Sequence, residues 1–224
     1  MGEKQKQKLI KDSVHGYIAV GEKFVKVINT ALFQRLKRLQ QTSYRVLYPS
    51  ASHDRFIHSI GVFYLGSLAF NSIKENTSEK IIDNFSEEIA KWEKPFLTAC
   101  LLHDIGHAPF SHTCEEFFDD KLLDDFLEAL KIKTTQEIFN TFKTDYNKDP
   151  RAKPHEVMSA LLVLKNQDLY ISELLKEPED FDFVTRAIMG NVYRSIVSEG
   201  KGEREIKNAL IKLRNPRPLA VVMS

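Results

Sequence analysis

The chain has 224 residues and a formal net charge of +1, with 42% hydrophobic and 28% charged residues. This composition suits a soluble protein with one sizeable core, and the near-neutral charge gives no indication of a nucleic-acid partner. The N-terminus is polar, and no apolar run approaches the ~20 residues that span a bilayer, so no membrane partner is expected. We expect a cytoplasmic protein whose cysteines, Cys100 and Cys114, are reduced thiols rather than a disulfide.

The N-terminal third of the chain predicts an extended arm followed by two helices. Residues 1–8 form a charged tail, and residues 9–20 alternate weakly in polarity around a central turn, which predicts a short hairpin or extended arm. Apolar side chains at helical spacing predict one helix over 24–41 and a second, apolar nearly all round, over 56–74. A helix of the second kind is buried, so we expect His58 to point into protein or into a cavity.

The remainder of the chain predicts an all-α fold. Pro95 is expected to interrupt one helix, and residues 143–154 carry two prolines and predict a loop. Helical spacing predicts further helices over residues 78–85, 96–104, 117–131, 155–165, 169–176, 181–189 and 203–213. We expect one helical domain over 9–214 and an atypical C-terminal segment over 215–224, where two prolines precede a short apolar run.

Residues 101–112 hold three of the seven histidines and the adjacent pair His103 and Asp104. Neutral imidazole and carboxylate together suit a divalent transition metal such as Mn²⁺, Fe²⁺, Co²⁺, Ni²⁺ or Zn²⁺. Neighbours on a helix splay by about 100°, so both can bind one ion only where the helix ends and the backbone turns. Gly106 and Pro109 predict that turn, and His58 is the best candidate for a third ligand.

The two later histidines of this stretch, His107 and His112, follow the expected metal ligands. They are candidates for holding an anionic substrate or for giving a proton to a leaving group, and Glu115 or Glu116 could orient one of the rings. A metal beside cationic donors suits the hydrolysis of a phosphate ester. A lone histidine is more often a packed or surface residue, but three within ten positions next to an aspartate favour a metal or catalytic role.

The motif His-Asp-Ile-Gly-His-Ala-Pro-Phe-Ser-His at residues 103–112, together with His58, resembles the HD superfamily of metal-dependent phosphohydrolases. Residues 12–16, 33–36 and 51–62, with His155-Glu156, resemble more narrowly its deoxynucleoside triphosphate triphosphohydrolase branch. The resemblance implies an HD-domain helical bundle that converts a dNTP to a deoxynucleoside and triphosphate. It also implies a homo-oligomer and a divalent transition metal (Mn, Fe, Ni, Co or Zn, with Mg as a further candidate).

The resemblance assigns roles to individual residues. It implies that His58, His103 and Asp104 are the metal ligands. It implies catalytic roles for His107, Glu115 and His112, and substrate binding by Gln41, Arg55, His112 and His155, with Gln41 on the deoxyribose and Arg55 on phosphate oxygens. From the residues alone, Arg55 could be a residue of a loop salt bridge, Gln41 an exposed helix residue and His155 a polar residue at a helix start.

The chain departs from the branch in two places. The family adds an aspartate ligand in an Asp-x-Asp-(Lys/Arg)-x-Asp-Tyr run, where this chain has residues 215–222 without an acidic side chain. Some family members have an allosteric nucleotide site at a subunit interface, and Asp12, Gln34 and Lys37 fall where such a site would draw its contacts, but the family usually has arginine at the position of Lys37. A nucleotide-binding protein with impaired catalysis is therefore the alternative, whereas phosphodiesterase or 5′-nucleotidase chemistry is disfavoured by residues 12–16 and 33–36.

Overall fold

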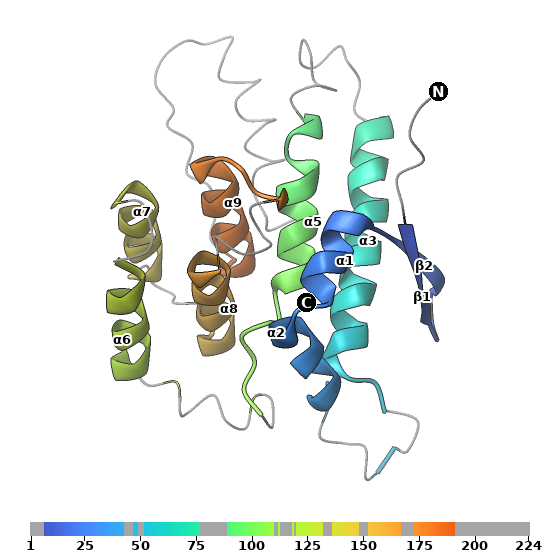
Figure 1. The fold of residues 1–224 in the computed structure, drawn as a ribbon, viewed down its shortest axis with the longest axis horizontal. Coiled ribbons are helices and arrows are strands. Elements are labelled where there is room, and N and C mark those ends of the chain that lie inside the picture. Colours follow the sequence, from blue (N-terminus) through green and yellow to red (C-terminus); the bar gives the residue numbers. More distant parts are fainter. Residues whose placement is uncertain are drawn as a thin grey trace.

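A computed structural model describes residues 7–42, 47–48, 52–76, 89–109, 112, 118, 120–131, 136–147, 152–166 and 173–190. Its described part is a bundle of helices with a two-stranded hairpin on one flank, and Figure 1 shows α5 between α3 on one side and α9 on the other. The all-α expectation with a short N-terminal hairpin is confirmed. The predicted helices over 78–85 and 203–213 and the segment over 215–224 lie outside the described residues.

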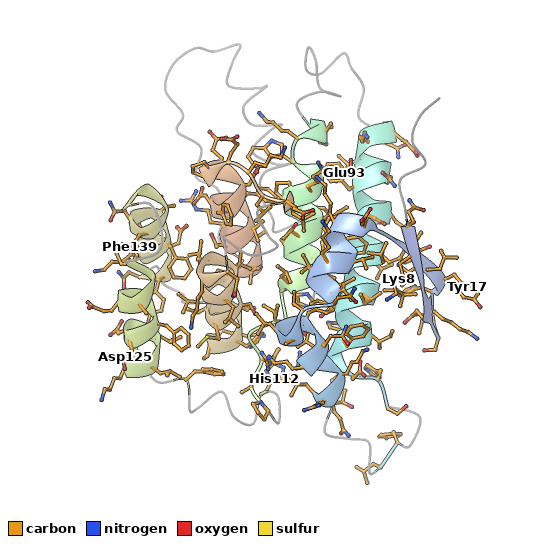
Figure 2. The ribbon with its side chains drawn as sticks, viewed as in Figure 1. Lys8, Tyr17, Glu93, His112, Asp125 and Phe139 are labelled. Atoms are coloured by element: carbon orange, nitrogen blue, oxygen red, sulfur yellow. The ribbon has the colours of Figure 1, made fainter. Side chains whose placement is uncertain are left out.

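The hairpin joins β1 (Gln7–Asp12) and β2 (Gly16–Gly21) in antiparallel register. Its turn is held by Asp12, whose Oδ1 accepts hydrogen bonds from the backbone N–H groups of Val14 and His15. Gly16 closes the turn at φ +77°, in the left-handed region that glycine enters without strain. Ile18 faces the core and is fully buried, whereas Figure 2 shows Tyr17 pointing away from the body of the protein.

The single helix predicted over 24–41 is wrong. The chain forms α1 (Glu22–Ile28), α2 (Ala31–Gln34) and the 3-10 helix η1 (Arg35–Arg38). The break lies at Thr30, whose hydroxyl donates to the carbonyl of Val27 and accepts from the N–H of Phe33. A threonine that caps the next helix in this way ends the previous one, because its own backbone is extended (φ −67°, ψ 149°).

The centre of the bundle is the contact between α3 (Arg55–Asn76) and α5 (Glu93–Leu102). The two helices approach closely at Gly66, where an added Cβ would lie 2.6 Å from the sulfur of Cys100. Among the described residues, α3 is the one helix long and apolar enough to span a bilayer, but its buried face packs against α5 as a core helix does. Pro95 does not interrupt α5, because it lies in the first turn, where its missing N–H is not needed.

Four helices complete the bundle: α6 (Asp120–Lys131), α7 (Gln136–Tyr146), α8 (Pro154–Lys165) and α9 (Pro178–Ile188). Helix α9 packs against α5, α7 and α8, and α6 packs against α7 and α8. The loop predicted over 143–154 begins too early, since α7 continues to Tyr146 and buries Phe142 and Tyr146. Of the helix predicted over 169–176, the described residues 173–176 form no α-helix, although Leu174 and Leu175 are buried.

This arrangement positions the candidate site at one end of α5. Figure 2 shows Glu93, at the first turn of α5, and His112, beyond its last turn, at opposite ends of this helix. Leu101 and Leu102, in the last turn, are fully buried. The last turn is therefore held firmly by the core, and the residues that follow it are presented at a fixed place beside the start of α3.

Candidate metal centre and histidine cluster

Helix α5 ends at Leu102, and His103 is its C-terminal capping residue. The chain then turns, with the N–H of Ile105 donating to the carbonyl of Leu102 and that of His107 donating to the carbonyl of Asp104. His103 and Asp104 therefore both lie where the helix ends and the backbone turns. The structure therefore has the helix end that the adjacent His-Asp pair requires.

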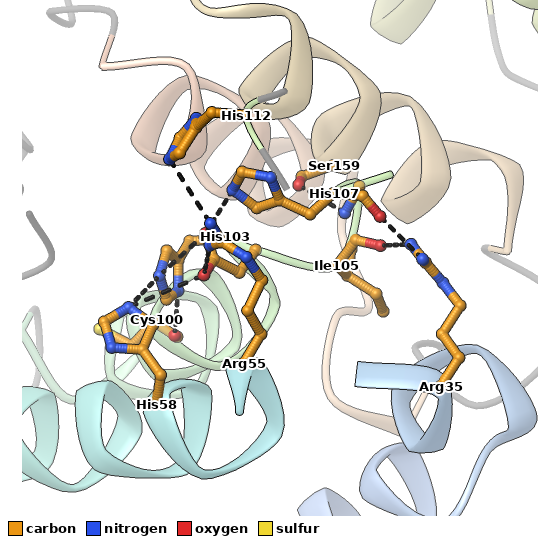
Figure 3. Close-up of polar contacts among 11 residues, drawn as sticks. Arg35, Arg55, His58, Cys100, His103, Ile105, His107, His112 and Ser159 are labelled. Atoms are coloured by element: carbon orange, nitrogen blue, oxygen red, sulfur yellow. Dashed lines mark hydrogen bonds and ion pairs between the residues drawn. The ribbon is translucent and has the colours of Figure 1, made fainter. Parts of the chain in front are cut away.

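The side chains of His58, His103 and Asp104 converge on one point. Figure 3 shows His58, from α3, facing His103 at the end of α5. The Nε2 atoms of the two rings lie 3.3 Å apart, His103 Nε2 lies 3.4 Å from Asp104 Oδ1, and His58 Nε2 lies 3.7 Å from Asp104 Oδ2. One potential ligand atom from each of the three residues lies within 4.8 Å of the others.

These distances fit a shared divalent cation. A metal bound at about 2.0–2.1 Å holds tetrahedrally arranged ligand atoms ~3.4 Å apart. The ring of His103 is also oriented as a ligand requires, because its Nδ1 lies 2.9 Å from the carbonyl oxygen of Cys100. A proton on Nδ1 donated to that carbonyl leaves Nε2 with a lone pair for the cation. The donor set of two imidazoles and one carboxylate suits a transition metal.

The carboxylate of Asp104 is surrounded by one arginine and three imidazoles. Arg55, the first residue of α3, places Nη1 2.5 Å from Asp104 Oδ2, and the Arg55 side chain is only 2% exposed. Burial acts to raise the pKa of Asp104, but the charges of His103 and Arg55 and a hydrogen bond from His107 together lower it well below its ordinary value. Asp104 is therefore a carboxylate at neutral pH, the form that binds a cation. Burial, reinforced by the charge of His103, lowers the pKa of His58 to about 4.

A second group of imidazoles adjoins the first. The ring of His107 stacks on that of His155, from the first turn of α8, with centroids 3.9 Å apart, and His112 lies edge-on to both. One ring nitrogen from each of these three histidines lies within 4.8 Å of the others. The groups are linked because His107 Nε2 lies 3.3 Å from Asp104 Oδ1 and His112 Nε2 lies 3.4 Å from Arg55 Nη2. Burial lowers the pKa of His107.

The structure thus brings seven sequence-predicted site residues into one region: His58, His103, Asp104, Arg55, His107, His112 and His155. Gln41 follows η1, and its amide oxygen is buried with no hydrogen-bond partner among the described residues. Its backbone N–H donates to the carbonyl of His53, which fixes the chain before α3. Glu115 lies outside the described residues.

The residues expected at an allosteric site are only partly brought together. Asp12 and Lys37 line a pocket of about 680 Å³ between the hairpin turn and the start of α3, and His58 lines the same pocket. Gln34 is not among the described lining residues, because its side-chain amide donates to the backbone carbonyl of Ile28. This pocket opens beside the metal-ligand cluster.

Sequence reasoning missed two residues that hold the turn after α5. Arg35 donates to the backbone carbonyls of Ile105 and His107, and Ser159 accepts a hydrogen bond from the N–H of Gly106 (Figure 3). In the sequence, Arg35 belongs to the polar face of an expected helix, and Ser159 is a small residue within another. Neither position carries a local signal for a contact with a segment 53 or more residues away.

The fold is helical, and the end of one core helix brings together a histidine, a His-Asp pair and further histidines. This combination defines the class of protein to which the chain belongs. The HD domain family model matches residues 55–177, and this chain belongs to that family.

Similar proteins include the deoxynucleoside triphosphate triphosphohydrolase SAMHD1 of Gallus gallus, which is 34% identical over 179 residues, or 77% of this chain and 26% of that protein. The SAMHD1 homolog of Dictyostelium discoideum is 39% identical over 120 residues, covering 52% of this chain and 22% of the relative. An uncharacterized protein of Methanocaldococcus jannaschii is 39% identical over 139 residues, or 57% of this chain and 27% of its own length. The chain thus matches about a quarter of the length of these relatives.

Proposed function

We propose that this chain is a metal-dependent phosphohydrolase that acts on nucleotides, with a deoxynucleoside triphosphate as substrate and a deoxynucleoside and inorganic triphosphate as products. The observation that carries the proposal is the convergence of His58, His103 and Asp104 within 4.8 Å, directly beside a second group of imidazoles. Relatives named as deoxynucleoside triphosphate triphosphohydrolases support the choice of substrate.

The three converging residues would hold the metal. A divalent cation, when bound there, supplies Lewis acidity toward a phosphoryl oxygen and toward water. Asp104 contributes the negative charge, and its pairing with Arg55 keeps the carboxylate in one orientation. His103 contributes a ring whose orientation is fixed by the carbonyl of Cys100. His58 contributes an imidazole that burial keeps neutral at physiological pH, as a ligand must be.

The remaining side chains would bind and orient the phosphates. The guanidinium of Arg55 lies between Asp104 and His112, and its second terminal nitrogen faces the side where the three imidazoles cluster. Planar guanidinium donors match phosphate oxygens well. His112 and His155 would add hydrogen bonds to the same group, and the side-chain amide of Gln41, whose oxygen is buried, would bind the deoxyribose.

His107 is the side chain best placed to act on the reacting group. Its Nε2 lies 3.3 Å from Asp104 Oδ1, so it borders the metal cluster, and its ring borders the phosphate-binding imidazoles. In the proposed reaction an oxygen of water attacks the α-phosphorus and the bond to the 5′ oxygen breaks. The proton that water loses and the proton that the 5′ oxygen gains would pass through the imidazoles of this cluster.

Product analysis tests the proposal directly. The purified protein would be incubated with each of the four dNTPs and with Mn²⁺, Fe²⁺ or Mg²⁺, and the products separated by anion exchange. We expect release of inorganic triphosphate together with the deoxynucleoside. Asp104→Asn should abolish the reaction, because the variant loses the anionic metal ligand. Asp125→Asn, an exposed carboxylate of α6 far from the site (Figure 2), is the matched control and should retain activity.

Two outcomes would overturn the proposal. The first is that a folded protein of confirmed metal content releases no phosphate product with any of the metals. This result would exclude a phosphohydrolase acting on these substrates. Thermal stabilisation by dNTPs under the same conditions, without turnover, would identify a nucleotide-binding protein in its place.

A further inference from the structure

Arg35 makes an unusual contact for a residue of a short 3-10 helix. Its side chain reaches from η1 to the turn after α5 and donates from two terminal nitrogens to two backbone carbonyls, those of Ile105 and His107. The bond from Nη1 to the carbonyl of His107 is 2.7 Å long, and Figure 3 shows the guanidinium facing both carbonyls. Arg35 touches none of the side chains proposed to bind metal or phosphate among its described hydrogen bonds.

The two carbonyls need such a donor. Ile105 and His107 are 2% and 1% exposed, so water does not reach their backbone freely. A buried carbonyl without a hydrogen bond costs free energy, and the turn lies past the end of α5, where no following helical N–H is available. One guanidinium satisfies both carbonyls at once because its donors lie in a fixed planar fork. Its positive charge also lies near the C-terminal end of α5, where the helix dipole favours a cation.

The opposite side of the same turn is held by α8. The N–H of Gly106 donates to Ser159 Oγ over 2.8 Å, and a Cβ at Gly106 would lie 2.3 Å from the backbone nitrogen of Ser159. Three consecutive residues, 105 to 107, are therefore clamped between Arg35 on one side and α8 on the other. The clamp ends at His107, whose ring packs at 3.9 Å on His155 of α8 and borders Asp104.

From these contacts we infer that Arg35 is a positioning residue, which fixes the backbone of residues 105–107 and thereby the place of the His107 imidazole between Asp104 and His155. The inference rests on the proposed function, because it assigns a consequence for turnover to a residue that does not touch the substrate. A misplacement of about 1 Å in a catalytic group can lower a rate ~100-fold. Loss of Arg35 should therefore lower kcat strongly and alter KM little.

The test compares Arg35→Met, which keeps the length but loses both donors, with Arg35→Lys, which keeps the charge but not the fork. The matched control is Arg186→Met, because Arg186 is a largely buried arginine that pairs with Asp145 and Asp182 away from the site. Two quantities are measured for each variant: kcat and KM for dNTP hydrolysis, and amide hydrogen exchange of the peptide covering residues 103–109.

In Arg35→Met we expect kcat to fall by about 10- to 100-fold with KM changed by less than about threefold. Amide exchange should accelerate in residues 103–109 while α9 stays protected. Arg35→Lys should restore part of the kcat and part of the protection of residues 103–109 from amide exchange. Arg186→Met should show the reverse pattern, with faster exchange in α7 and α9, and a kcat close to that of the unaltered protein.

Unchanged exchange in residues 103–109 of Arg35→Met would overturn the inference. A uniform acceleration along the chain, matched by Arg186→Met, would also overturn it, because the role would then be one of general stability. If the unaltered protein hydrolyses no dNTP, the proposed function fails on its own. The exchange measurements still decide in that case whether Arg35 holds the turn.

Discussion

Arg55 and Asp104 form a buried ion pair, with Arg55 Nη1 2.5 Å from Asp104 Oδ2 and side chains 2% and 6% exposed. The pair joins the first residue of α3 to the turn after α5, so it links the two helices that provide the proposed metal ligands. A buried pair of this kind gives little net stability, because desolvation offsets the attraction, but removal of one partner leaves an uncompensated charge.

We predict that Arg55→Met destabilises the fold by about 3–5 kcal/mol, because Asp104 is left as a buried carboxylate without its arginine partner. Urea unfolding followed by circular dichroism, in the presence of a chelator, measures the change. The double variant Arg55→Met with Asp104→Asn should recover part of the loss, since the unpaired charge is gone. If the loss of unfolding free energy in the double variant equals the sum of the losses in the two single variants, Arg55 and Asp104 are not energetically coupled.

We also predict that His58→Gln and His103→Gln each weaken Mn²⁺ binding by more than ~100-fold. Removal of a group that only hydrogen-bonds to a metal ligand lowers the affinity by about 10- to 100-fold, and removal of the ligand itself should cost more. Each substitution removes one of the imidazoles that converge on Asp104. Titration calorimetry with Mn²⁺ on the metal-free protein measures the affinity. His15→Gln is the control, because His15 packs on Tyr64 and belongs to neither histidine group. Equal affinity in all three variants would place the cation elsewhere.

Gly106 should not tolerate a side chain. A Cβ there would lie 2.3 Å from the backbone nitrogen of Ser159 and 2.6 Å from the carbonyl oxygen of His155, and neither atom can move without moving α8. We predict that Gly106→Ala lowers the free energy of unfolding by about 1–3 kcal/mol through overpacking. Gly21→Ala, with no neighbouring atom within 4 Å and an ordinary φ of −64°, serves as the control. Equal stability of the two variants would show that α8 can shift at low cost.

Cys100 should be inert toward thiol reagents in the folded protein. Its side chain lies against Gly66 in the α3–α5 contact, and burial raises the pKa of the thiol to about 12. At pH 8 only about one thiol in 10⁴ would be the reactive thiolate. In a Cys114→Ser background, which leaves Cys100 as the sole cysteine, labelling by iodoacetamide should require unfolding. Rapid labelling under native conditions would contradict the buried position.

The same pKa shift predicts a pH dependence of stability. The folded thiol keeps its proton to higher pH than the unfolded thiol, whose ordinary pKa is 9.0. The stability that Cys100 contributes is therefore complete below pH 9 and is lost as the pH rises toward 12. The free energy of unfolding should fall less steeply over this range in Cys100→Ala than in the unaltered protein, and identical slopes would contradict the prediction.

Much of the fold could be predicted from local patterns. The buried helix around His58, the hairpin and the helix end at residues 103–109 follow from hydrophobic spacing and from glycine and proline. The residues at which helices begin and end were less predictable. Thr30 divides an apolar pattern that is continuous in the sequence. A threonine can cap a helix or lie within one, so the sequence alone did not reveal this break. Tyr146 extends α7 into a polar stretch, since tertiary burial of one face outweighs local composition.

The sequence by itself determined which residues could carry the chemistry. Imidazoles and a carboxylate are needed to bind a transition metal, and their clustering at residues 103–112 is visible without coordinates. Only the tertiary structure decided how they are held. It paired Arg55 with Asp104, stacked His107 on His155, and placed Arg35 and Ser159 on the turn between them. These contacts join segments 48 or more residues apart and depend on how helices pack, a relation that no local pattern records.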